Sequence, residues 1–183
     1  MKKLIAALVV GLMLGGCGEE SKTQTIEIIK PAVVQPPDYM SIGIKVDEFS
    51  ASFNEAAQVN QSGFKIPAIT LEKNSTFKFS FNKNIAMVGA FNSSDHMMRS
   101  ITMLAQSDGT SDSAARMPIL MHDIIRATNS GLPANETALL ALTLFQNAVN
   151  HMEEVQEDVR NGIRYAAIFS KGTGLLFVAD QKR

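Results

Sequence analysis

The sequence predicts an α+β fold: a single antiparallel sheet of five or six strands with helices packed on one face. Three observations predict it. Short apolar runs are joined by short polar connections, as hairpins require. Two segments with helical periodicity follow them, and the chain ends on a further hairpin pattern. With 183 residues, of which 45% are hydrophobic, the chain can bury one sizeable core.

The first half of the domain begins with a predicted helix within residues 46–58, with Asp47 as its N-cap and Phe49 and Phe53 on one face. Four predicted strands follow, at residues 65–71, 76–82, 85–91 and 97–105. In the second of these, Lys78 and Ser80 separate three phenylalanines. Because strand neighbours point to opposite faces, we expect helices to cover the phenylalanine face.

The second half contains two predicted helices and a hairpin. The first helix lies within 111–131 and is expected to start or kink at Pro118. The second is capped by Asn135, and its end near Met152 or Val159 is left open by the pattern. Its predicted apolar stripe consists of Leu139, Leu142, Phe145, Val149 and Met152. Residues 163–170 and 175–180 form the closing hairpin, so the predicted order is α-β-β-β-β-α-α-β-β.

The N-terminus has the pattern of an export signal. Two lysines precede an apolar run over residues 4–16, which is too short to span a bilayer comfortably. This run ends in Leu14-Gly15-Gly16-Cys17, which resembles the lipobox of bacterial lipoproteins. The resemblance covers only these first residues. It implies that the signal is cut between Gly16 and Cys17, and that Cys17 becomes acylated and holds the protein in a membrane.

The same resemblance implies a location in the bacterial cell envelope. Gly18 follows the cysteine, where an aspartate would favour the inner membrane, so we expect the outer membrane, facing the periplasm. The predicted organisation is a signal peptide over 1–16, a lipidated tether over 17–43, and one α+β domain over 44–183. Three prolines in the tether, Pro31, Pro36 and Pro37, disfavour a helix or a central strand there.

The chemistry of the domain favours binding over catalysis. A formal net charge of −1 gives no field for nucleic acid, and the sequence holds no nucleophile elbow, zinc-protease motif or P-loop. We therefore expect a non-enzymatic module of the inhibitor, exclusion, immunity or assembly-accessory type, with another envelope protein or a glycan as partner. An envelope enzyme whose site is scattered over loops, and a carrier of a metal or small ligand, remain alternatives.

No cofactor or metal site is expected. Each histidine neighbours a methionine, a pair of ligands that suits copper, at His96, His122 and His151. Sequence neighbours on a strand or helix point in different directions, however, so no such pair chelates locally. The predicted partner surface is instead the uncovered face of the sheet, with Lys78, Arg99 and Arg164 exposed on it.

Replacement of the predicted anchor residue tests the lipoprotein interpretation. Cys17→Ser in the full-length chain should abolish incorporation of labelled palmitate and leave an uncleaved precursor, because the thiol is the acyl acceptor in this class. Gly18→Ala is the control and should label as the parent does. Absence of label or of acyl mass from the parent protein would contradict the prediction.

Overall fold

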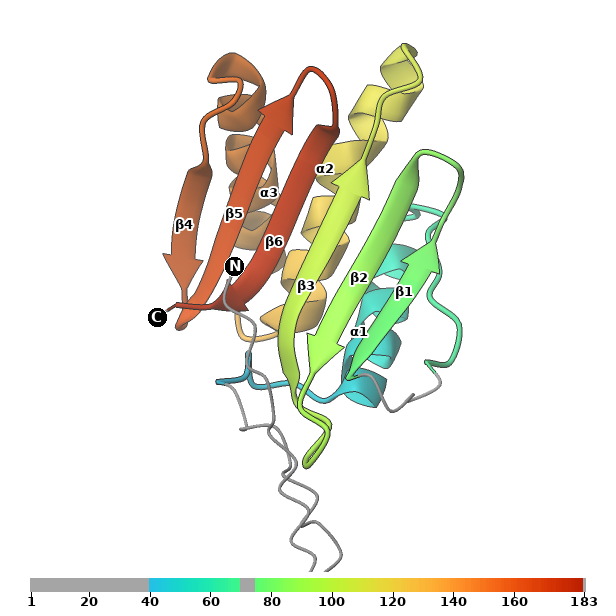
Figure 1. Ribbon diagram of the computed structural model, residues 1–183, viewed down its shortest axis with the longest axis vertical. Helices are drawn as coiled ribbons and strands as arrows, with labels where there is room; N and C mark the ends of the chain where they lie inside the picture. Colours follow the sequence, from blue (N-terminus) through green and yellow to red (C-terminus); the bar gives the residue numbers. More distant parts are fainter. Residues whose placement is uncertain (1–39, 70–74, 183) are drawn as a thin grey trace, which may run out of the picture. The chain divides into compact units, whose positions relative to one another are not determined.

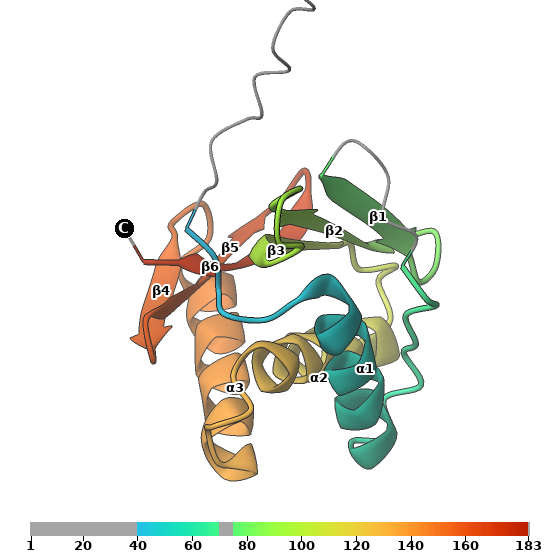
Figure 2. The same ribbon diagram turned by 90° about the horizontal axis from the view of Figure 1, so that it is seen from below.

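The computed structural model describes residues 40–69 and 75–182. In this part of the chain, one six-stranded antiparallel sheet carries three helices on one of its faces (Figures 1 and 2). This confirms the predicted fold class. The elements are α1 (Val46–Val59), β1 (Thr76–Ser80), β2 (Ile85–Phe91), β3 (Met98–Ala105), α2 (Ser111–Thr128), α3 (Ala134–Asn150), β4 (Gln156–Arg160), β5 (Ile163–Ser170) and β6 (Gly174–Gln181).

The sheet consists of two antiparallel three-stranded units that meet in its middle. The strand order is β1-β2-β3-β6-β5-β4, so β3 and β6 join the halves and β1 and β4 form the edges. The helices α2 and α3 connect the halves across the inner face, with α2 in the centre of the helix layer and α1 and α3 on either side of it (Figure 2).

The core lies between the sheet and these helices. As the alternation predicted, Phe77 faces the helices, where its ring stacks on that of Phe49 from α1 at a centroid distance of 6.5 Å. Phe79 and Phe81 are only partly buried, because they lie on the edge strand and the turn that follows it. The aromatic side of the first hairpin is therefore core, as expected, and Lys78 is exposed.

The first of the predicted strands does not form. Residues 65–69 pair with no described strand, and residues 70 and 71 lie outside the described part of the chain. The Asn54 side chain accounts for this, since its amide donates to the Ile66 carbonyl at 2.8 Å and its Oδ1 accepts from the Ile66 N–H at 2.8 Å. A helix side chain thus takes the backbone hydrogen bonds that a neighbouring strand would otherwise make.

The strand that completes the six-stranded sheet is instead β4, which is formed by Gln156–Arg160 within the acidic run after α3. The observed order is therefore α-β-β-β-α-α-β-β-β, with three strands on each side of the two helices. Helix α3 ends at Asn150, close to Met152, the first of the two ends that the sequence left open. Glu153 then adopts a φ of 67° as the chain turns into β4.

Three predicted helix starts also differ. Lys45 occupies the N-cap of α1 and Asp47 lies in its first turn. Pro133 precedes α3, so Asn135 is inside the helix. Helix α2 begins seven residues before Pro118, because the Thr110 side chain caps it by accepting from the Ser113 N–H. Asp47 and Asn135 thus lie in the first turns of their helices, and Pro118 is the eighth residue of α2.

The domain begins before residue 44. Ile42, which the sequence places in the tether, is 5% exposed and packs in the core. Its N–H donates to the Met98 carbonyl at 2.8 Å, and the Met98 N–H donates to the Ile44 carbonyl at the same distance. This short pairing fixes the described N-terminal residues beside the start of β3.

Gly89 tests the packing of the first hairpin. It lies opposite Phe77 in the register of β1 and β2, and a Cβ at this position would overlap the Phe77 ring. Gly89→Ala should lower the free energy of unfolding by about 1–3 kcal/mol through overpacking, and by less in a Phe77→Leu background. Denaturant melts of the four proteins measure this coupling. Ala90→Ser on the other face is the control, and equal losses in both backgrounds would contradict the prediction.

Candidate functional site

Helix α3 lies at one end of the helix layer (Figure 2), and the described residues cover it on one side only. Its covered side contacts α2 and the inner face of the sheet at β4 and β5. The buried residues on this side are small or medium in size: Thr137, Leu140, Ala141, Leu144 and Ala148.

The predicted apolar stripe of α3 lies on the opposite side of the helix. Leu139 is 65% exposed, Leu142 43% and Val149 38%, and at about 100° per residue these positions fall within about 80° of the helix circumference. Met152, just beyond the helix, is also exposed, whereas Phe145 is partly buried against the core. The predicted apolar stripe therefore faces away from the core, except at Phe145. We call Leu139, Leu142, Val149 and Met152 the α3 stripe.

The helix at the other end of the layer has no such stripe. The exposed side of α1 carries charged and polar residues, with one large apolar side chain at its last position: Asp47, Glu48, Ala51, Glu55, Gln58 and Val59. Helix α3 differs from α1, because its outward side carries the large side chains of the α3 stripe. Exposed polar residues lie beside them, at Asn135, Thr143, Gln146 and Asn150.

The surroundings of the α3 stripe are acidic. Residues 134–159 include five acidic residues and neither lysine nor arginine. Glu136 lies in the first turn of α3, and Glu153 and Glu154 follow its C-terminus; all three are exposed. None of the three forms an ion pair with a described residue, so carboxylates frame the stripe at both ends.

A polar network joins all three helices behind this surface. The Asn60 amide at the end of α1 donates to Asp123 Oδ1 at 2.6 Å and lies 3.2 Å from His122 Nδ1. His122 Nε2 lies 2.9 Å from Thr137 Oγ1, and this hydroxyl donates to the Ala134 carbonyl at 2.9 Å. Because an amide N–H donates to Nδ1, the arrangement requires a neutral His122 that carries its proton on Nε2.

Burial perturbs both titratable members of this network. It lowers the pKa of His122, and the nearby Arg126 adds to the effect. Burial raises the pKa of Asp123, which is fully buried, and the Ser62 and Asn60 side chains and Arg126 offset only part of that rise. Asp123 Oδ2 has no hydrogen-bond partner among the described residues. The network links the three helices through Asn60, His122, Asp123 and Thr137.

The predicted partner residues do not form one site. Lys78 is exposed on the outer face, as predicted, whereas Arg99 and Arg164 are partly buried. Arg99 lies at a β-bulge, where Phe91 pairs with Met98 and Ala90 with Ser100. Lys78 on β1 and Arg164 on β5 are four strand spacings apart, or about 19 Å.

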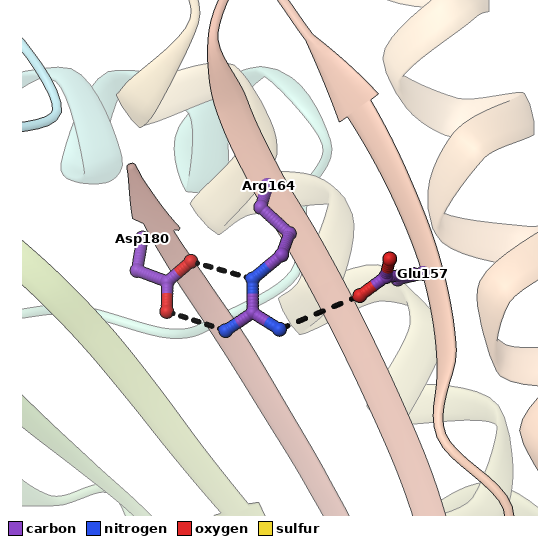
Figure 3. A network of polar contacts seen from close by, with 3 residues as sticks. All are labelled: Glu157, Arg164 and Asp180. Atoms are coloured by element: carbon purple, nitrogen blue, oxygen red, sulfur yellow. Dashed lines mark hydrogen bonds and ion pairs between the residues drawn. The ribbon is translucent and has the colours of Figure 1, made fainter. Parts of the chain in front are cut away.

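Arg164 is already occupied by two carboxylates (Figure 3). Its Nε and Nη2 donate to the two oxygens of Asp180 on β6, at 2.9 and 2.6 Å. Its Nη1 donates to Glu157 on β4 at 3.4 Å, and the hydrogen bond with Asp180 is the main cause that raises the pKa of Arg164 further. The guanidinium thus holds three strands together, which makes it a poor contact for an acidic partner.

Comparisons with models of protein families, with curated proteins and with solved structures find no match for the chain. Within residues 40–69 and 75–182, no three His, Cys, Asp or Glu side chains are arranged to hold a metal ion. In the same residues, no helix combines the length and the apolar character needed to cross a membrane. The α3 stripe is the feature of the described surface that departs most from an ordinary domain.

The pH dependence of stability tests the buried Asp123. A carboxyl whose folded pKa lies above its unfolded value of about 3.9 loses stabilising effect as the pH rises through the folded pKa. Asp123→Asn removes this loss, so its free energy of unfolding relative to the parent should rise between about pH 4 and pH 7. Denaturant melts at both pH values measure the difference. Asp112→Asn, at an exposed position of the same helix, is the control. The prediction is contradicted if the free energy of unfolding of Asp123→Asn, relative to the parent, does not rise between the two pH values.

Proposed function

We propose that this chain is a bacterial envelope lipoprotein, anchored through acyl chains on Cys17, that acts as a non-enzymatic binding module. The observation that carries the binding role is the α3 stripe, because a fold with a filled core leaves an aligned row of large apolar side chains in water. Contiguous exposed apolar surface of this kind marks interaction sites in soluble domains. The stripe lies on the helix layer and not on the outer face of the sheet, so the proposed surface differs from the one that the sequence predicts.

The anchor and the location rest on the N-terminal sequence. The lipobox resemblance at Leu14–Cys17 supports lipidation, and Gly18 supports the outer membrane with the domain in the periplasm. Residues 1–39 lie outside the described part of the chain. Two or more acyl chains hold a protein stably in a bilayer, so a lipidated chain would meet its partner close to the membrane surface.

The character of the stripe favours a protein partner over a glycan. Its side chains are aliphatic or thioether groups, which gain from packing against other apolar side chains. The polar groups that the fold brings together, around His122 and around Arg164, are engaged with one another. An inhibitor, an exclusion or immunity factor and an assembly accessory all require such a protein-binding surface.

Site-specific photo-crosslinking tests this function. The full-length chain carries p-benzoylphenylalanine in place of Leu142 or of Leu104, an outer-face leucine of matched exposure, 42% against 43%. We expect a discrete protein adduct in intact cells from position 142 that is lost with Leu139→Lys. An adduct from position 104 alone would move the site to the sheet, and turnover that depends on one polar side chain would overturn the binding role.

A further inference from the structure

The α3 stripe has the dimensions of a helix-binding seam. Its helical part extends from Leu139 to Val149, which at 1.5 Å per residue is about 15 Å, and Met152 lies just beyond the helix. Its helical members are spaced by three and seven residues, so they form a straight row along α3. A row of this kind fits the apolar side of one antiparallel or parallel helix of about four turns.

The charges around the stripe determine what such a helix must carry. Glu136 lies at one end, and Glu153 and Glu154 lie at the other. The second pair follows the C-terminus of α3, where carbonyl groups already make negative charge unfavourable. Lysine or arginine at both ends of a partner helix would relieve this repulsion. In β4, by contrast, Glu157 and Asp158 are paired with Arg164 and Arg160.

The same charges disfavour a second copy of this chain as the occupant. Antiparallel packing of α3 against its own copy places Glu136 of one molecule near Glu153 and Glu154 of the other. Parallel packing places each of these residues beside itself. Both arrangements bring like charges together at both ends of the seam, and like-charge contacts are used in proteins to reject partners.

Gln146 interrupts the stripe between Leu142 and Val149. It is exposed on the same side of α3, so a partner helix would cover it. A covered amide costs free energy unless it is hydrogen-bonded, and one polar pair inside an apolar seam fixes the register of two helices. The partner should therefore present a polar side chain at the middle of its apolar row.

From these observations we infer that the α3 stripe binds an amphipathic helix of another protein, with basic residues at both ends and a polar residue at its centre. This inference rests on the proposed binding function and names the chemistry of the partner. It places the contact on the helix layer, away from the sheet.

A synthetic helix provides the probe. It is an 18-residue, fluorescently labelled peptide with leucine at every third or fourth position, one glutamine at the centre of that row, and two lysines at each end. The full-length chain is held in nanodiscs of phosphatidylcholine, and empty nanodiscs are the blank. We expect saturable binding by anisotropy, and at least about tenfold weaker binding of a peptide with glutamates in place of the lysines.

Two matched variants locate the binding site. Leu142→Lys should weaken binding by at least about tenfold, because it puts a charge in the seam and repels the lysines. Leu104→Lys, at a leucine of equal exposure on the sheet, should leave it unchanged. Failure of the lysine peptide to bind below about 1 mM, equal binding of both peptides, or equal effects of the two variants would overturn the inference.

Comparison of the peptide result with the crosslinking result decides separately whether the proposed function holds. If the peptide fails while the adduct from position 142 persists in cells, the partner is not a basic helix, but the chain still binds through the stripe. If both fail, the binding function fails with the inference. Dimers of the full-length chain that dissociate with Leu142→Lys would assign the stripe to a second copy and would also overturn the inference.

Discussion

The packing of α2 against the sheet is the contact on which the rest of the domain depends. Met117, Leu120, Met121, Ile124 and Ile125 are at most 1% exposed, so this helix is enclosed by the sheet and by its two neighbours. At its end, the Thr128 hydroxyl lies 3.0 Å from that of Tyr165, a fully buried residue of β5. Because α2 takes the central place, α1 and α3 are left at the ends of the layer with one side each uncovered.

The orientation of α3 follows from a polar contact as much as from apolar burial. Thr137 is fully buried and lies within hydrogen-bond distance of His122, which in turn is linked to Asn60 at the end of α1. If α3 were rotated so that Leu139 and Leu142 faced the core, these hydrogen bonds would break. Their donors and acceptors would then be left without partners. The alanines on the buried side also let α3 approach α2 closely. Leu140 and Leu144 are buried beside these alanines, whereas Leu139 and Leu142 lie outside.

This explains which parts of the molecule the sequence could predict. Periodicity locates three helices and five of the six strands, because each of those segments is apolar on one side. It fails for β4, whose residues 156–160 are mostly polar and join the sheet at an edge. It fails for residues 65–69, which a single asparagine diverts, and it does not decide which side of α3 is buried, because both sides carry apolar residues. The contact between Thr137 and His122, which has no signal in the sequence, helps to select one side.

Both sides of α3 carry large apolar side chains, but the described residues cover only one of them. Exposing either row forgoes about 1.5–3 kcal/mol for each large apolar side chain that could have been buried, and rotation merely exchanges one row for the other. A helix that is apolar on two sides is satisfied only when it is covered on both. The described chain supplies one cover, formed by α2, β4 and β5. In the binding role proposed above, a partner supplies the second cover, and Glu136, Glu153 and Glu154 favour a basic one. An apolar row that ends in carboxylates would then set both the shape and the charge of that partner.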